Sequence, residues 1–490
     1  MTGQQKLTAL AAALALGATA FAGVTEDAAL LDAARQGDAA GLARLLAAGA
    51  NAATATPTGE TALYWAAQAG DAAGARALLR AGAKVTANRY GITPLHLACT
   101  AGDTAMITLL LDAGAEAGLA TMDGRTPLML AARTGRAEAV RALLARGADV
   151  KTSEPTQLQT ALMWAAEQGH LDTVKTLLAA GADLNARSKG GFSALLFAVR
   201  SGRAAVVDAL LAAGADANEA LGADAESASR ASALALAVTN QHYALGARLL
   251  AAGADPNYVW QGRTVLHLLT WVSRPGAGSN DPAPEGSGSM DRLAFVRELV
   301  KRGANVNARM TGGQNGPRTV LNLRGATPFL LSARTADAEL MRLLAQLGAD
   351  PKMPNNDRTT PLMVAAGVGV QSPGEDPGDE AEVLEAVKLA VELGNDVNAV
   401  DANGETALHG AAYKWAASTV PFLVASGARL EVWNTKNRNG WTPLRIADGV
   451  HRGMNLRGSP TTAAALREIM RAAGVSTEVE PETNISGGTK

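Results

Sequence analysis

Apolar positions recur along most of the chain in one fixed order. A short apolar stretch with helical spacing follows a Thr or Ser, and a second stretch ends in a Leu-like pair and a Gly. In one unit, Thr93-Pro94-Leu95-His96-Leu97-Ala98 opens the first stretch, Gly102 closes it, and Leu109-Leu110 precede Gly114. This order predicts two short helices, the second over about 104–112, each stopped by a left-handed Gly.

The closing glycine recurs along the chain at intervals of about 33 residues in the first half and at longer intervals in the second. It stands at Gly49, Gly82, Gly114, Gly147, Gly181, Gly214, Gly253, Gly303, Gly348, Gly394, Gly427 and Gly474. One helical pair cannot cover its own apolar face, so such units are stable only when stacked. The spacing therefore predicts a helical repeat array.

The tetrapeptide that opens each unit is suited to begin a helix. The Thr hydroxyl caps the first helix, Pro suits the first helical position, and a His three residues after the Thr bonds back to that hydroxyl. We assign this structural capping role to Thr93, His96, Thr264, His267, Thr406 and His409. No two histidines have metal-ligand spacing, so the sequence predicts no metal site.

At these residues the chain resembles the ankyrin-repeat family, whose period is about 33 and whose signature reads T-P-L-H-x-A. The variants include Thr126-Pro127-Leu128-Met129, Thr264-Val265-Leu266-His267 and Thr406-Ala407-Leu408-His409. With a capping unit from about Thr25 to Ala50, we count twelve units. The resemblance implies an all-α solenoid of helix-turn-helix units with short finger loops, which binds a partner protein through these loops and the concave face of the first helices.

This solenoid is expected over residues 23–475, with regular repeats over about 25–257 and insertion-bearing repeats over about 258–475. The insertions fall at 273–290, 308–323, 369–381 and 449–460. The third holds Glu375, Asp376, Asp379 and Glu380, which lack the order of a calcium-binding loop and are expected to face solvent. Residues 476–490 have no apolar period and are expected to form a disordered tail.

The N-terminus has the pattern of a secretory signal peptide. Lys6 precedes an apolar run from Leu7 to about Ala20, and Ala20-Phe21-Ala22 offers a small-x-small cleavage site before Gly23. The run is shorter than the roughly 20 residues that span a membrane, so we expect no span in the mature form. We expect residues 1–22 to be removed and the protein to be exported, to the periplasm first, with secretion as the alternative.

Composition narrows the chemistry further. The formal net charge of -2 is spread evenly, which argues against a nucleic-acid partner. Cys99 is the only cysteine, so internal disulfides and Cys-based zinc sites are excluded, and we expect a small buried side chain there. No nucleophile set, phosphate loop or carboxylate pair is organised, so we predict no catalytic residue, no cofactor and no enzyme. An enzyme with its site on the insertions is the weakest alternative.

Aromatic residues gather in the second half of the chain. Tyr258, Trp260 and Trp433 follow Gly-Ala in finger loops, where we expect them to be exposed and to contact a partner. Trp65, Trp164 and Trp271 belong to first helices and are expected to pack on the next repeat. The function we predict is a monomeric protein-interaction scaffold of the bacterial cell envelope, and a secreted effector that binds a host protein is the alternative.

Overall fold

The computed structural model describes residues 26–222, 230–272, 274, 285–312, 321–370, 376–452 and 455–479. The expected signal peptide at 1–22, Glu375, and most of the expected tail lie outside these residues. The described residues form twelve successive helix pairs, as the repeat count predicted. We number these repeats 1 to 12 in chain order.

The first helices are residues 26–36, α3 (Ala62–Ala69), α5 (Pro94–Ala101), α7 (Pro127–Thr134), α9 (Ala161–Gln168), α11 (Ala194–Arg200), α13 (Ala233–Thr239), α15 (Val265–Val272), α17 (Pro328–Arg334), α19 (Pro361–Ala366), α21 (Ala407–Lys414) and α24 (Pro443–Asp448). The second helices are α2 (Ala39–Ala47), α4 (Ala72–Arg80), α6 (Thr104–Asp112), α8 (Ala137–Ala145), α10 (Leu171–Ala179), α12 (Ala204–Ala212), α14 (Tyr243–Ala251), α16 (Arg292–Lys301), α18 (Ala338–Gln346), α20 (Glu380–Glu392), α22 (Thr419–Ala425) and α25 (Pro460–Ala472).

The chain divides into two compact units, which are described separately. Unit 1 comprises residues up to Asp216 with Leu221–Ala223, and unit 2 comprises Ala217–Ala220 with Asp224–Lys490. Repeats 1 to 6 belong to unit 1 and repeats 7 to 12 to unit 2.

Helix ends follow from local side chains. First helices begin after a Thr or Ser whose hydroxyl accepts a backbone N–H of the first turn, as at Thr93 and Ser193. Several second helices begin after an Asp that does the same, such as Asp71 and Asp103. Gly102 ends α5 with φ +67°, a left-handed conformation that an L side chain rarely adopts.

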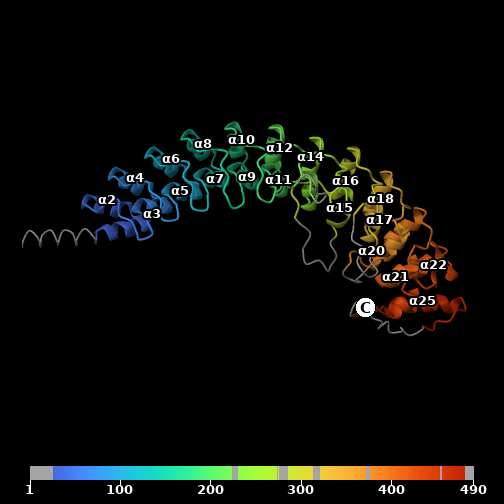
Figure 1. Cartoon of the computed structure of the whole chain (residues 1–490). Helices are drawn as coiled ribbons and strands as arrows, with labels where there is room; N and C mark the ends of the chain where they lie inside the picture. Colours follow the sequence, from blue (N-terminus) through green and yellow to red (C-terminus); the bar gives the residue numbers. More distant parts are fainter. Residues whose placement is uncertain are drawn as a thin grey trace, which may run out of the picture. The chain divides into compact units, whose positions relative to one another are not determined.

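Helices stack in two layers within unit 1. The first helices α3, α5, α7, α9 and α11 contact one another in sequence, and so do the second helices α4, α6, α8, α10 and α12 (Figure 1). Leu and Ala side chains fill the space between layers, for example Leu63, Leu95 and Leu128. In unit 2 the first helices α13, α15, α17, α19, α21 and α24 stack in the same manner.

The finger loops, which run from each second helix to the next first helix, are built on polar side chains. In many fingers one side-chain oxygen of an Asn or Asp accepts two backbone N–H groups within the turn. The Asn88 side chain does so from Tyr90 and Ile92. Single backbone hydrogen bonds then join neighbouring fingers, such as Met122 N–H to Tyr90 C=O at 3.0 Å. The fingers therefore form a fixed row within each unit.

Asparagine side chains tie the repeats of unit 2 together at a second point. The Asn257 amide donates to the Gly303 carbonyl at 2.9 Å, and its oxygen accepts the Asn305 N–H at 2.8 Å. Asn218, Asn307 and Asn398 make the same two bonds to the next repeat. We call these four residues the asparagine bridges.

Phe295 fills the core between repeats 7 and 8. Its ring is fully buried and stacks on Tyr243 of α14 with centroids 5.6 Å apart. A Cβ at Gly246, in the middle of α14, would lie 2.7 Å from the Phe295 ring. Glycine at this helix position is therefore a packing requirement, since it makes room for the ring.

The insertions lie where the sequence placed them, between α15 and α16, α16 and α17, α19 and α20, and α24 and α25. Two details were not predicted. Residues Val450–Arg452 and Asn455–Arg457 form a small antiparallel hairpin, β1 and β2, and Leu430–Trp433 form a one-turn helix, α23, in a finger loop. The mostly helical fold stands, with a short hairpin added to it.

Cys99 lies on α5 with no exposed surface, and burial raises the pKa of its thiol. This agrees with the small buried side chain expected from the sequence. Among the described helices, none combines the length and apolar character that crossing a membrane requires.

Candidate protein-binding surfaces

Two of the capping histidines, His267 and His409, join consecutive repeats. The Thr264 N–H donates to His267 Nδ1 at 3.1 Å, and the Thr264 hydroxyl lies 2.8 Å from the same nitrogen. Because Nδ1 accepts, Nε2 carries the proton and donates to the Ala326 carbonyl of repeat 9 at 3.2 Å. Thr406 and His409 repeat this arrangement toward the Trp441 carbonyl, and Thr93 with His96 repeats its Nδ1 half.

Burial lowers the pKa of His267 and His409 to about 4, and it also lowers the pKa of His96. The rings are therefore neutral at neutral pH, as two-sided hydrogen bonding requires. Their geometry is that of internal connectors, with the ring directed into the protein.

The finger aromatics differ from what the sequence predicted. Trp433 was expected to be exposed, but the structure contradicts this, since only 2% of its surface is accessible. The one-turn helix α23 directs it inward, and α23 packs on α21. Tyr258 and Trp260 are half-buried, and Trp260 pairs through its backbone with Arg263 across a tight turn. Partner contact remains a prediction for Tyr258 and Trp260 alone.

Unit 1 has an exposed apolar row that the sequence analysis did not select. Tyr90, Met122 and Leu158 belong to three successive fingers and are 47%, 76% and 44% exposed. We call these three residues the finger row. Their only sequence signal is an apolar residue at a turn position, which one sequence cannot distinguish from chance.

Unit 2 has a pocket of about 200 Å³ between the first helices of repeats 8 and 9. Leu268 and Trp271 of α15 line it, together with Leu331 and Arg334 of α17. The finger loops add a second arginine and two apolar side chains, namely Arg263, Met310 and Leu323. We call it the arginine pocket.

Trp271 was expected to pack on the next repeat, and it does so in part. The guanidinium carbon of Arg334 lies 5.4 Å from the centroid of its ring, yet the side chain is 46% exposed. The sequence analysis did not propose Trp271 or Arg334 as site residues. They meet only through the stacking of α15 on α17, with two insertions between them in the sequence.

Comparison with known proteins agrees with this geometry. A family model described as ankyrin repeats (3 copies) matches residues 30–121, 83–154, 101–188 and 152–220, and one described as ankyrin repeats (many copies) matches 380–424. The chain is an ankyrin-repeat protein. Among solved structures it is similar to the human ASB11 ankyrin repeat domain, at 31% identity over 46% of this chain and 98% of that domain, with a TM-score of 0.42. No curated protein sequence matches the chain.

Ankyrin repeats are typical of protein-interaction scaffolds and are typically not enzymatic. The described parts of this ankyrin-repeat chain contain no cluster of three His, Cys, Asp or Glu that could hold a metal ion. The acidic insertion residues Asp379 and Glu380 are exposed, as expected, and each also accepts a backbone N–H group, from Glu382 at 2.9 Å and from Ser418 at 2.7 Å. Asp379 thereby caps α20.

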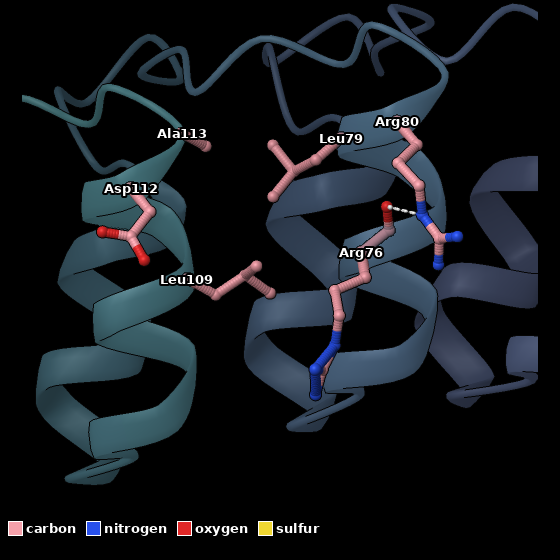
Figure 2. A pocket seen from close by; sticks show the side chains of 6 residues that line it. All are labelled: Arg76, Leu79, Arg80, Leu109, Asp112 and Ala113. Carbon is pink, nitrogen blue, oxygen red and sulfur yellow. Dashed lines mark hydrogen bonds between the residues drawn. The ribbon is translucent and has the colours of Figure 1, made fainter.

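A second concavity lies on the second helices of repeats 2 and 3 of this ankyrin array. Figure 2 shows Leu79 of α4 and Leu109 of α6 pointing toward each other, with Arg76 and Arg80 along α4. The groove measures about 340 Å³, and the Arg80 Nε donates to the Arg76 carbonyl at 3.3 Å. Asp112 at its edge is paired with Arg146 of repeat 4. We interpret this outer groove as the seam between two stacked helices.

Proposed function

We propose that this ankyrin-repeat protein is a scaffold that holds a partner protein outside the cytoplasm, in the bacterial cell envelope. The observation that carries the proposal is the finger row. Apolar side chains are commonly exposed singly, but Tyr90, Met122 and Leu158 are exposed on consecutive fingers of one unit. Tyr90, whose ring carries the Arg89 guanidinium, and the flexible Met122 belong to residue types that are enriched at interfaces.

The rigidity of the fingers supports the same proposal. Backbone hydrogen bonds connect the finger of repeat 3 to that of repeat 2 through Arg89 and Thr58, and to that of repeat 4 through Met122 and Tyr90. The surface is thus already ordered before a partner arrives. Binding then loses little conformational entropy, which leaves more of the contact energy as affinity.

Binding is tested with the full chain and a variant in which Tyr90, Met122 and Leu158 are all replaced by Ser. Partners are captured from a periplasmic extract, identified, and their affinities are measured. We expect at least a hundredfold loss, about 2.7 kcal/mol, because two or three anchors usually carry most of the binding energy. Arg76→Gln with Arg80→Gln in the outer groove is the control. Equal affinity of the triple variant and this control would refute the finger row.

The cellular location is tested separately. We expect the mature chain to begin at Gly23 and to be found in the periplasmic fraction, because residues 1–22 have the signal-peptide pattern. Recovery from the culture medium would instead favour a secreted effector. A mature chain that keeps Met1 and stays in the cytosol would contradict export.

A further inference from the structure

Two arginines line the arginine pocket, and the carboxylate of Asp376 only partly offsets the charge of one of them, Arg334. The Arg263 and Arg334 side chains make no hydrogen bond or ion pair with the described residues, whereas other arginines in unit 2 do: Arg274 pairs with Glu382 at 2.6 Å, and Arg292 pairs with the buried Asp337.

A third cationic side chain, Lys414, adds to the positive potential near Arg334. Lys414 of α21 donates to the carbonyls of Asp376 and Pro377 at 3.1 and 2.7 Å, so it binds backbone rather than a carboxylate. Burial lowers the pKa of Lys414 and of Arg334, and the carboxylate of Asp376 opposes both effects. An arginine stays protonated in proteins, so Arg334 keeps its charge in a poorly solvated place.

The shape of the pocket limits what fits. A volume of about 200 Å³ is below that of drug-sized ligand sites, which begin at roughly 300 Å³, and suits one or two side chains. Leu268, Leu331 and Met310 make part of the wall apolar, and Trp271 offers an exposed aromatic face. The pocket thus combines a cationic side with an apolar side.

We propose that the arginine pocket binds an acidic segment of the partner protein, in which an Asp or Glu stands next to an apolar residue. The proposal rests on the scaffold function above and adds the chemistry of the partner. The Arg334 fork can meet the carboxylate with two parallel N–H donors while its planar face stays over Trp271. The neighbouring apolar side chain lies against Leu268 and Leu331.

The test uses the full chain and two blocked peptides, acetyl-Ala-Leu-Glu-Leu-Ala-amide and the same peptide with Gln in place of Glu. Affinities are measured by saturation-transfer NMR at low ionic strength, because a single pocket of this size gives weak binding. We expect the Glu peptide to bind at least tenfold more tightly. Equal affinity for the two peptides would overturn the proposal.

Variants assign the effect to the pocket. Arg334→Gln should remove the preference for Glu, and Arg334→Lys should keep only part of it, since Lys lacks the two-pronged geometry. Arg133→Gln in unit 1 is the matched control, because Arg133 also lies in the last turn of a first helix, and its guanidinium carbon also lies 5.4 Å from a Trp ring centroid, that of Trp164. Loss of preference in the control, or its survival in Arg334→Gln, would refute the assignment.

Two further outcomes are decisive. If Asp376→Asn raises peptide affinity tenfold, the chain's own carboxylate competes for the pocket, and the external partner is the wrong occupant. The triple finger-row variant should keep the Glu preference. If the chain prefers the Glu peptide but captures no protein, the pocket chemistry holds and the scaffold function is refuted. If the chain captures a protein but does not prefer the Glu peptide, the scaffold function holds and the pocket chemistry is refuted.

Discussion

Units 1 and 2 use the same repeat but connect neighbouring repeats differently. Unit 1 has nearly constant spacing and no asparagine bridge among its described residues, whereas unit 2 carries insertions and has all four bridges. Asn257 and Gly303 are 46 residues apart in the sequence, and Asn398 and Gly427 are 29 apart. The hydrogen bonds from the two Asn amides to these carbonyls are nevertheless similar, at 2.9 and 3.0 Å. A bridge therefore fixes the stacking of two repeats whatever is inserted between them.

The last residues of the first helices differ between the units too. In unit 1, Arg200 at the end of α11 forms an ion pair with Glu167 of α9 at 2.6 Å. In unit 2 the corresponding positions of repeats 8 and 9 are Trp271 and Arg334; Arg334 forms no ion pair with a described residue, although the Asp376 carboxylate acts on its charge. The same position thus forms an ion pair between repeats in one unit and lines the arginine pocket in the other.

The largest predicted effect is the loss of folding stability of unit 2 at low pH. His267 and His409 of unit 2 have a pKa near 4 in the folded state and about 6.5 when unfolded. As pH falls from 6.5 to 4, the unfolded state binds protons that the folded state does not, so stability falls, by about 3 kcal/mol for each ring. Below pH 4 both states are protonated and the loss stops growing.

His267→Gln with His409→Gln should flatten this part of the stability curve, because Gln does not titrate and still suits the third helical position of a capped helix. Urea unfolding at pH 7, 5.5 and 4.5 measures the slope for both proteins. A slope unchanged by the double substitution would show that other groups destabilise unit 2 in acid.

Phe295→Ala should cost about 3–5 kcal/mol, since it removes a fully buried ring and leaves a cavity beside Gly246. Leu143→Ala in α8 is the matched change in unit 1, where about 2–5 kcal/mol is expected. Hydrogen exchange measured by segment reports which helices lose protection. If the units are separately cooperative, each substitution affects its own unit; loss of protection in both would make them one folding unit.

Removing one asparagine bridge should have a smaller effect. Asn307→Ala deletes the bonds to Gly348 and Asp350, at 3.2 and 2.8 Å, and should destabilise unit 2 by about 1–2 kcal/mol. Asn185→Ala is the control in unit 1, because it has the same position in its repeat and its side chain bonds to no other repeat. Equal losses by denaturant unfolding would show that the bridges do not distinguish the units.

Exposed ion pairs should matter least in both units. Glu138→Gln breaks a pair with Arg141 within α8, and Glu385→Gln breaks one with Arg342 between α20 and α18, each at 2.8 Å and well exposed. Each should cost below about 1 kcal/mol in thermal unfolding, and less at high salt. A larger loss for Glu385→Gln would mean that charge, as well as amide bridges, connects the repeats of unit 2.

The repeat pattern contained most of the fold, because its causes are local. Thr93 and His96 are three residues apart, Gly102 ends a helix by its own conformation, and each unit repeats the pattern. The candidate binding sites depend instead on meetings across repeats. Arg334 reaches Trp271 only after α17 has stacked on α15, and Trp433 turns inward because its finger contains a helical turn that no repeat signature marks. Contacts between residues of different repeats produce no regular spacing in the sequence, so they could not be predicted from it.

The rate at which Cys99 reacts with a thiol reagent can report local opening of unit 1. A thiol reagent reacts with the exposed thiolate, and this buried side chain offers neither exposure nor ready deprotonation while repeat 3 is closed. As the chain has one cysteine, its modification rate in native buffer reports how often α5 opens, without any engineered label. Whether capture of a partner slows that rate would reveal, from a single atom, how far binding tightens the array.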